Sequence, residues 1–383
     1  MVILLTHVLQ QLQLFGWVIF SLLLLFFLIH VIQIFMFSGR VAWLKKAPRE
    51  VAMPLSVIMT LRNEEENLRK NLPGILSAGK ADYEVVVIDD FSHDDTLTFL
   101  GTLRHQEPKL RFSSLSQETR YSEKMARNIA LKSSRNEWVI FVSPSTSRMG
   151  SLWPEGIMLQ MHSPADVVIN YSNVEPEGRF INLLFRLELF FQQLKSFGFI
   201  MNGFSYIVTE ENVAFRKQKY FEGGGFRGKM AESYVNLELV INTFIQKSNT
   251  SLELTDDTSV FKSEQVTISS LLELLKKEAR LLQHLSPVRK ALFFSFEWVH
   301  ILFLPLVVLM LFKWLSFWPL VVALTVLPAI GYTFIIKKVL VRLGEGKLFL
   351  PSLLFALLWP YFKVVYRTVY NYSRRQKRWK ERK

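Results

Sequence analysis

The strongest constraint on this chain is that its two ends are apolar and largely uncharged, whereas its middle is not. Residues 1–39 contain no Asp, Glu, Lys or Arg, and a second uncharged run covers 314–336. A third run, 291–312, carries one acidic residue, Glu297. Because about 20 apolar residues span a bilayer, these runs predict membrane helices on both sides of a soluble domain. A simple soluble globule and a fully embedded bundle are both excluded.

The runs divide the chain into four predicted parts. These are an N-terminal membrane anchor over 1–39, a soluble domain over 40–290, a transmembrane hairpin over 291–336, and a re-entrant or interfacial segment with a basic tail over 337–383. The apolar start has no basic flank before it and no small-residue cleavage site, so we interpret it as a retained anchor. Lysines and arginines follow it directly, and positive flanks stay inside. We therefore expect a multi-pass protein of the inner (cytoplasmic) membrane with its soluble domain in the cytoplasm.

The number of membrane spans depends on residues 348–362. This segment has 15 residues and contains Pro351 and Pro360. A full fourth span would place the basic tail outside, against the charge rule. We therefore favour three spans and one re-entrant or interfacial segment, with four spans as the alternative.

The amino-acid composition excludes several kinds of catalytic and metal-binding site. The chain has 383 residues and no cysteine, which excludes disulfides, thiolate metal sites and cysteine nucleophiles. The net charge is +13, and the last ten residues hold seven Lys or Arg and one Glu. Because this tail follows an apolar segment, we interpret it as a cytoplasmic membrane flank and predict no nucleic-acid partner.

The middle of the chain has the pattern of an α/β sheet. Short runs rich in Val and Ile cover 56–60, 84–89, 138–142 and 166–170, and stretches of helical period lie between the first three. Such continuous apolar runs are typical of strands buried on both faces. A further apolar stretch, 180–199, predicts either a helix near the bilayer or a buried core helix.

Polar residues cluster where the first two strands end, which is where ligands bind in such sheets. Asp89 and Asp90 end a buried strand, so we favour a ligand role over turn chemistry for them. For Asp94 and Asp95 we favour helix capping. Lys124 opens a later helix, at an end that attracts phosphate.

These pieces resemble the family 2 glycosyltransferases. The resemblance rests on PLSVIMTLRNEEENLRKNLPGIL from residue 54, EVVVIDDFSHDDT from 84, EKMARNIALKSSRNEWVIFV from 123, and ENVAFRK from 211 followed by three glycines. It covers about 54–285 and implies the GT-A fold, a nucleotide-binding mixed sheet with flanking helices. It also implies an inverting sugar transfer from a nucleotide sugar to a lipid-linked or polysaccharide acceptor at the cytoplasmic face.

The resemblance also assigns positions to the site. The nucleotide sugar would be bound by Asn63, Glu64, Asp89, Asp90, Lys124 and Arg280. The family holds Mg²⁺ or Mn²⁺ with an Asp-x-Asp motif. Here these positions are Ser143 and Ser145, and serine hydroxyls bring no charge.

Two further motifs are substituted. The general base of the family falls on Asn236, whose amide cannot accept a proton at neutral pH, and Glu232 and Glu238 are the nearest acids. The acceptor and diphosphate motif falls on Lys277, Arg280 and Leu281. Since metal, base and acceptor motifs are all altered, the alternative to an active transferase is an inactive relative that acts as scaffold or partner of another glycosyltransferase subunit.

Overall fold

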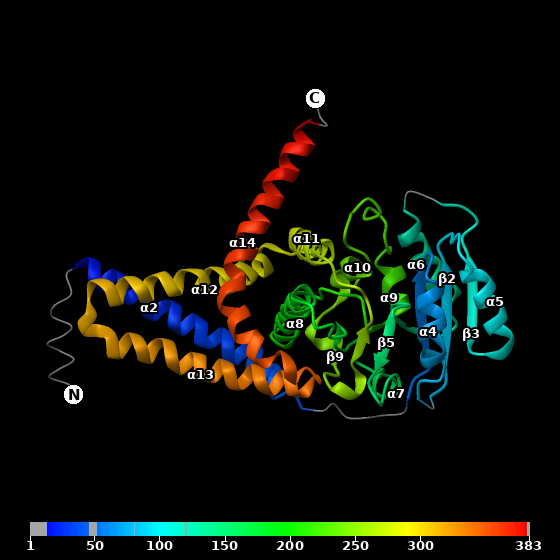
Figure 1. Cartoon of the computed structure of the whole chain (residues 1–383), viewed down its shortest axis with the longest axis horizontal. Helices are drawn as coiled ribbons and strands as arrows, with labels where there is room; N and C mark the ends of the chain where they lie inside the picture. Colours follow the sequence, from blue (N-terminus) through cyan, green and yellow to red (C-terminus); the bar gives the residue numbers. More distant parts are fainter. Residues whose placement is uncertain (1–13, 46–51, 80, 119–120, 381–383) are drawn as a thin grey trace. The chain divides into compact units, whose positions relative to one another are not determined.

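The computed structural model describes residues 14–45, 52–79, 81–118 and 121–380 (Figure 1). The chain forms two compact units. One, here called the sheet domain, comprises Leu44–Leu281 and Arg342–Glu345. The other, the helical unit, comprises the chain up to Trp43 together with Leu282–Val341 and Gly346–Lys383.

The sheet domain is built on a mixed sheet of seven strands in the order β3-β2-β1-β4-β8-β6-β9. The first four strands of this order are parallel, and β8 is antiparallel to both of its neighbours. The strand bounds are β1 Leu55–Leu61, β2 Tyr83–Asp89, β3 Leu110–Ser114, β4 Trp138–Phe141, β6 Val167–Ile169, β8 Val213–Arg216 and β9 Thr250–Leu252. The four runs expected from the sequence are β1, β2, β4 and β6, and the predicted mixed α/β sheet is confirmed.

Helices cross between the parallel strands, as the periodicity predicts. These crossover helices are α4 Glu65–Leu76, α5 Thr96–Gln106 and α6 Ser122–Ser133. The later helices of the domain are α7 Glu155–Met158, α8 Phe180–Met201, α9 Lys217–Glu222, α10 Leu237–Phe244 and α11 Ile268–His284, with short 3₁₀ turns at Lys247–Asn249 and Asp256–Thr258. In α4 the side chains of Leu68, Leu72 and Ile75 recur at helical spacing and are fully buried. Pro73 and Gly74 lie between the buried positions Leu72 and Ile75, so they do not interrupt the apolar face of α4.

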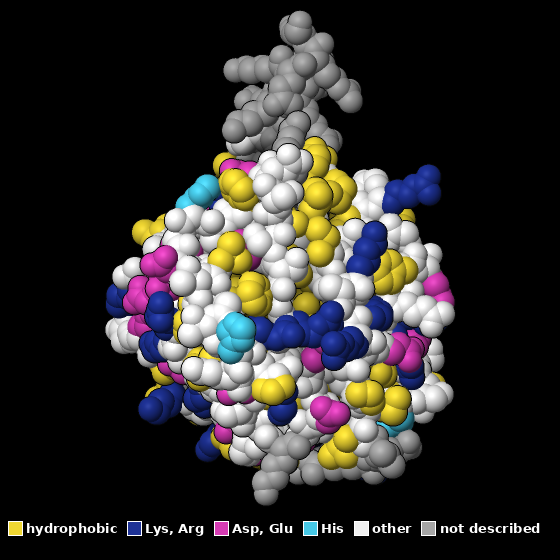
Figure 2. Space-filling view, turned by 90° about the vertical axis from the view of Figure 1, so that its right-hand side faces the viewer, with side chains coloured by type: hydrophobic (Ala, Val, Ile, Leu, Met, Phe, Trp, Pro, Cys, Tyr) yellow, Lys and Arg dark blue, Asp and Glu magenta, His cyan; other side chains and the backbone are white. Residues whose placement is uncertain are grey.

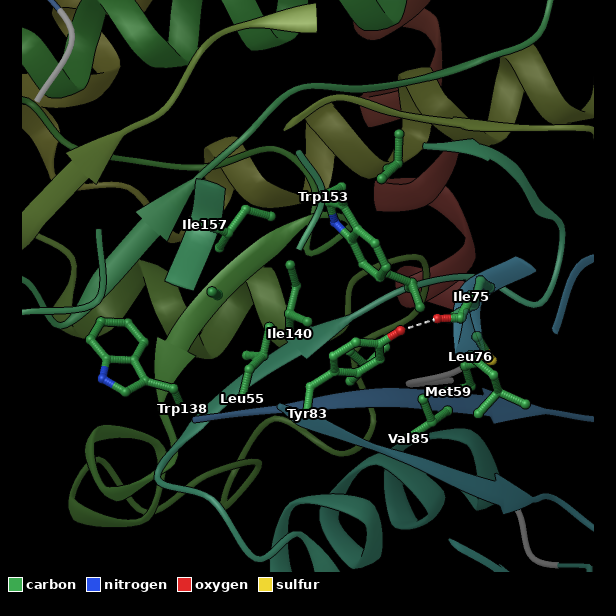
Figure 3. Packing of buried hydrophobic residues seen from close by; sticks show 14 of the residues in the cluster. Leu55, Met59, Ile75, Leu76, Tyr83, Val85, Trp138, Ile140, Trp153 and Ile157 are labelled. Atoms are coloured by element: carbon green, nitrogen blue, oxygen red, sulfur yellow. Dashed lines mark hydrogen bonds between the residues drawn. The ribbon is translucent and has the colours of Figure 1, made fainter. Parts of the chain in front are cut away.

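Figure 3 shows the core between this helix and the strands. Tyr83 of β2 packs its ring there and donates its hydroxyl to the carbonyl oxygens of Ile75 at 2.5 Å and Ala78 at 2.9 Å. A buried phenol thus keeps a hydrogen-bond partner while its ring fills the core. The side chains around it include Leu55, Met59, Val85, Ile140, Trp153 and Ile157.

Several strands have no clear signal in the sequence. β3 lies at the edge of the sheet and is half exposed, so it lacks the continuous apolar run of its neighbours. A second sheet of three short strands has the order β5-β10-β7, with bounds Thr146–Met149, Val260–Lys262 and Ser172–Val174. Such three- and four-residue strands are defined by pairing between distant segments, which local sequence does not reveal.

Helix α8 is mostly buried within the sheet domain. Gln193 accepts from the backbone N–H of Ser172 and donates to its carbonyl, which ties α8 to β7. Arg186 forms an ion pair with Glu345, and both side chains are buried. The hydroxyl of Tyr171 and the amide of Asn173 donate to the same carboxylate at 3.2 and 2.9 Å. These contacts favour the core-helix interpretation of 180–199 over a helix at the bilayer.

The surface of the sheet domain mixes both signs of charge. Figure 2 shows Lys and Arg side chains gathered in a band across one face, with acidic and apolar side chains on either side of it. Mixed charge of this kind is typical of a solvated surface.

The helical unit is formed by long apolar helices. The bounds are α2 Leu14–Ile32, a π-helical stretch at Gln33–Gly39, α3 Arg40–Ala42, α12 Pro287–Lys313, α13 Trp318–Arg342 and α14 Phe349–Lys380, with 3₁₀ turns at Leu315–Phe317 and Gly346–Leu348. Residues of α2, α12 and α13 share one apolar cluster that includes Leu23, Met310 and Val321. Glu297 of α12 is buried and forms a bidentate ion pair with Arg367 of α14. Its charge is thus compensated inside the unit.

Among the described residues, four helices are long and apolar enough to cross a membrane: Phe15–Ala42, Pro287–Lys313, Leu315–Arg342 and Gly346–Ser373. The last includes the segment 348–362, expected to be re-entrant or interfacial. Both the three-span and the four-span arrangement remain predictions, as does the cytoplasmic placement of the sheet domain. The end of the basic tail, 381–383, lies outside the described residues.

Arg186→Met tests the buried ion pair of the sheet domain. Removing one partner leaves the Glu345 carboxylate buried without its counter-ion, which typically costs about 3–5 kcal/mol. The matched control is Arg179→Met, whose pair with Glu177 is partly exposed and is expected to contribute about 0–1 kcal/mol. Thermal unfolding of the full chain in detergent should show a much lower melting temperature for Arg186→Met alone. Equal shifts for the two variants would contradict the assignment.

Candidate active site

Polar residues from five segments meet at one edge of the large sheet. β1, β2 and β4 end there because they are parallel. β8 begins there because it runs antiparallel to β4, and Glu211 just before it bridges to Phe141. The sequence predicts the first three of these contributions. The acids that precede β8 are brought to the same edge only by its reversed direction.

The loop after β1 is fastened to the loop after β2. Asn63 has a left-handed backbone with φ of 53°, a conformation that asparagine tolerates better than most residues. Its N–H donates to the Ser92 hydroxyl at 2.8 Å, and its side-chain oxygen accepts from the His93 N–H at 2.8 Å. Glu64 donates its N–H to the Thr96 hydroxyl and accepts from Asn67 at 2.6 Å. Asn63 and Glu64, both predicted to bind the nucleotide, thus hold the loops after β1 and β2 together.

Asp89 and Asp90 have different surroundings. Asp89 is fully buried and accepts from the hydroxyls of Ser92 and Ser114 and from the Ser92 N–H. Asp89 therefore joins the loop after β2 to the end of β3. Asp90 is also buried, and its N–H donates to the Leu61 carbonyl at 2.7 Å, which places it between the ends of β1 and β2.

The capping interpretation holds for one of the two following acids. Asp94 accepts from the N–H groups of Thr96 and Glu65, both at 3.2 Å, so it caps α5 and joins it to α4. Asp95 occupies the N-cap position, but its side chain makes no capping hydrogen bond. The side-chain capping expected for Asp95 is therefore wrong, because its neighbour supplies the acceptor.

The two serines at the metal positions lie in a cluster that already contains a cation. The hydroxyls of Ser143 and Ser145 are 2.7 Å apart, and Ser145 donates to Glu264 at 2.7 Å. Lys262 places its ammonium nitrogen 3.1 Å from a carboxylate oxygen of Glu264 and 4.0 Å from one of Glu211. Glu211 also accepts from the Ser143 N–H at 2.6 Å.

These residues do not fit a divalent metal. Within the described residues, no group of three or more His, Cys, Asp or Glu side chains is arranged to hold one. The hydroxyl ligands carry no charge, and an ammonium beside them repels Mg²⁺ or Mn²⁺. Burial disfavours the charged form of Lys262, but the carboxylates of Glu264 and Glu211 outweigh it and raise the pKa of Lys262 above its ordinary value. The lysine therefore keeps its charge.

The segment expected to hold the base lies against α11. Glu232 pairs with Arg280, and Glu238 pairs with Lys277 at 3.1 Å. Leu281 packs with Val235 and Leu239. The three positions of α11 that the resemblance singles out all face the segment before and within α10.

Glu238 also belongs to a coupled carboxyl pair with Glu210. Glu210 accepts from Arg127 at 2.7 Å and from the Leu237 N–H at 2.7 Å. Burial alone would raise the pKa of Glu210, but the charges of Arg127 and Lys277 lower it to about 2. Glu238 is fully buried, and burial raises its pKa to about 7 despite Lys277. Two carboxyls whose surroundings separate their pKa values are typical of acid–base sites.

Asn236, at the aligned base position, makes structural contacts. Its N–H donates to Glu238 at 3.0 Å, and its amide nitrogen donates to Glu123 at 2.9 Å. Since Glu123 also binds Arg127, Asn236 is part of the same polar network.

Lys124 is engaged by the chain's own backbone. Its ammonium donates to the carbonyl oxygens of Met230 and Glu232, which holds the loop before α10. Burial lowers the pKa of Lys124. Beside it lies a pocket of about 330 Å³ between α6 and the glycines after α9. Gly225 has φ of 54°, and a Cβ there would meet the Tyr220 ring at 2.7 Å, so this turn requires glycine.

Part of the chain matches a known protein family. Residues 56–144 match the family described as Glycosyl transferase family 2, and this segment runs from β1 to the loop after β4. Over these residues the chain is similar to the family 2 glycosyltransferases. The predicted resemblance and GT-A fold class are confirmed. Among curated proteins, none matches the chain.

The chain is also similar to solved structures, one of which is a mannosyltransferase. The mannosyltransferase PcManGT from Pyrobaculum calidifontis, in complex with GDP-Man and Mn²⁺, is 17% identical, with 89% of this chain and 99% of that chain covered and a TM-score of 0.48. TarS 1-349 from S. aureus is 17% identical, with 85% and 92% covered and a TM-score of 0.42. The same TarS fragment is also similar in its complex with UDP-GlcNAc. At these values the family assignment rests on the match over 56–144.

The structure adds residues to the site of the glycosyltransferase domain that the sequence did not single out. They are Arg127, Glu210, Glu211, Lys262 and Glu264. One signal was available, since two adjacent glutamates precede the apolar run of β8 and would be unfavourable there without partners. Lys262 ends β10 and Glu264 follows it, and this strand is too short to be recognised from sequence.

Glu238→Gln tests the carboxyl pair through stability. The pKa of Glu238 is about 7 in the folded domain and near 4.5 when unfolded, so the folded state binds the extra proton between these values. The contribution is fully present below pH 4.5 and is lost as the pH rises through 7. Melting temperatures across this range should fall more for the natural protein than for the variant.

Glu222→Gln is the matched control, because Glu222 lies on exposed α9 and is half exposed. It should retain the pH dependence of the natural protein. Parallel curves for the natural protein and Glu238→Gln would refute the raised pKa.

Proposed function

We propose that this protein is a membrane-anchored glycosyltransferase. It transfers a sugar from a nucleotide sugar to a lipid-linked or polysaccharide acceptor at the cytoplasmic face. The family match over 56–144, the four long apolar helices and the basic residues that flank them support this proposal.

The observation that carries an active rather than an inactive domain is Glu238. It lies in the segment that the resemblance assigns to the base, and its pKa of about 7 suits proton transfer at neutral pH. Lys277 and the Asn236 N–H both contact the same carboxylate oxygen. The neighbouring Glu210 carboxyl also raises the pKa of Glu238, through its charge and through a hydrogen bond between the two side chains.

The proposed reaction uses residues of this chain alone. Asp90, Asn63 and Glu64 position the nucleotide at the ends of β1 and β2. The acceptor hydroxyl loses its proton to Glu238 as its oxygen bonds to the anomeric carbon. The bond from that carbon to the diphosphate oxygen breaks, and the nucleoside diphosphate leaves with the electron pair.

A second candidate function follows from how the cations are used. Lys124 is bound by backbone carbonyls and Arg280 by Glu232, so both predicted nucleotide ligands already have protein partners. This favours an inactive relative that serves as scaffold or partner of another glycosyltransferase subunit. In that case the protein should co-purify with such a subunit, and Ser143→Asp, Ser145→Asp and Asn236→Asp together should produce activity where there was none.

Asp90→Ala tests the transferase proposal. The full chain in detergent, given a panel of nucleotide sugars and lipid-linked or glycan acceptors, should release nucleoside diphosphate. Loss of a buried carboxylate at the nucleotide edge should lower kcat/KM by about 100-fold or more. Asp95→Ala is the control, because Asp95 makes no capping hydrogen bond and should leave the rate unchanged. No turnover by the natural protein across the panel would sink the proposal.

The pH dependence of the rate tests the base. Glu238 accepts a proton only when ionised, so kcat/KM should rise as the pH increases through about 7 and then level off. Glu238→Gln should remove this step and lower the rate by about 100-fold. A variant that retains both the rate and the pH step would show that another group is the base.

A further inference from the structure

We infer that Lys262 supplies, in the donor site, the positive charge that the resemblance assigns to a divalent metal. The nucleoside diphosphate group then binds at Ser143, Ser145 and Lys262 without Mg²⁺ or Mn²⁺. This inference rests on the proposed function and names the chemistry of its donor subsite.

The fold places Lys262 at this point. β10 pairs with β5 directly after the serine loop, and the register shifts between Phe261 and Lys262, where β5 has an extra residue. A bulge of this kind bends the strand that contains it and increases the local twist of the pair. The Ser263 N–H donates to the Ser145 carbonyl at 2.9 Å, which fixes the lysine segment to the serine loop.

The surroundings suit an anion held by hydrogen bonds and one ammonium. Lys262 has three N–H donors, of which Glu264 takes one at 3.1 Å, whereas Glu211 at 4.0 Å is beyond hydrogen-bond distance. The Ser143 and Ser145 hydroxyls hydrogen-bond to each other and to Glu264, and they become donors to a ligand that displaces Glu264. The Lys262 side chain is 19% exposed, so a ligand can reach it.

The ion pair with Glu264 does not close the subsite. The Glu264 side chain is 40% exposed, so it can turn outward into solvent when a ligand takes its place. A diphosphate carries more charge than one carboxylate and can replace Glu264 as the partner of the ammonium. Glu211 stays in place, because it is held by the Ser143 N–H at 2.6 Å.

The same cation serves the proposed reaction. Negative charge builds on the leaving diphosphate as its bond to the anomeric carbon breaks. An ammonium already fixed at that point stabilises this charge without reorganisation. The electron pair stays on the phosphate oxygen, and the lysine transfers no proton.

The test is calorimetric binding of UDP and GDP to the full chain in detergent, in EDTA and in Mn²⁺. The natural protein should bind one of them with the same affinity in both buffers. Lys262→Met should weaken binding in EDTA by about tenfold or more, since one charge-assisted contact is lost. Lys262→Arg keeps the charge and should retain most of the affinity.

Two further variants separate binding from folding. Lys262→Met leaves Glu264 without its counter-ion, so the double variant Lys262→Met with Glu264→Gln removes both charges and should be equally weak. The control is Lys217→Met, a lysine at the opposite end of β8 whose ammonium donates to the Ser134 carbonyl at 2.5 Å. It should bind as the natural protein does.

Each other outcome is decisive. Binding that requires Mn²⁺, or unchanged binding by both Lys262→Met variants, overturns the inference and leaves the transferase proposal standing. No binding of either nucleotide in either buffer overturns both, because the donor site itself is then missing.

Discussion

The adjacent carboxylates of Glu210 and Glu211 hold together the edge of the sheet on which the site depends. They precede β8, whose antiparallel direction brings them beside the ends of the parallel strands. Glu210 contacts Arg127 and the start of α10, whereas Glu211 contacts the serine loop and lies near Lys262. One short stretch of backbone thus fixes both the base segment and the metal position relative to the strands. Either carboxylate would be unfavourable at such burial without these partners.

Lysine and arginine side chains of this chain lie at the positions where the family resemblance leads one to expect a metal ion or contacts to the substrate. Lys277 and Arg280 of α11 meet Glu238 and Glu232, and Lys262 meets Glu264. The two pairs of α11 join segments far apart in the sequence, and Glu264 also accepts from Ser145 of the serine loop. The substitutions at Ser143, Ser145 and Asn236 therefore belong to a rearranged charge network. In such a network, removing one charged side chain leaves its partner buried without a counter-ion, which is strongly destabilising.

The sequence predicts the parts of the fold that depend on local pattern. Continuous apolar runs identified β1, β2, β4 and β6, and helical periodicity identified α4, α5 and α6. The order of the family motifs also predicted that α11 and the Glu238 segment belong to one site, and the structure places Lys277 on Glu238. It could not predict Lys262 or Glu211, because their positions follow from a three-residue strand and from the direction of β8. These are properties of long-range pairing, which no local propensity encodes.

The central claim is that a fixed ammonium stands where the family resemblance assigns a metal ion. A cryo-electron microscopy map of the full chain with a nucleoside diphosphate, prepared in Mn²⁺, tests it most directly. The account predicts phosphate density within hydrogen-bond distance of Lys262 and the two serine hydroxyls, with no cation between them. A metal ion coordinated at Ser143 or Ser145, with Lys262 turned away from the diphosphate, would contradict it.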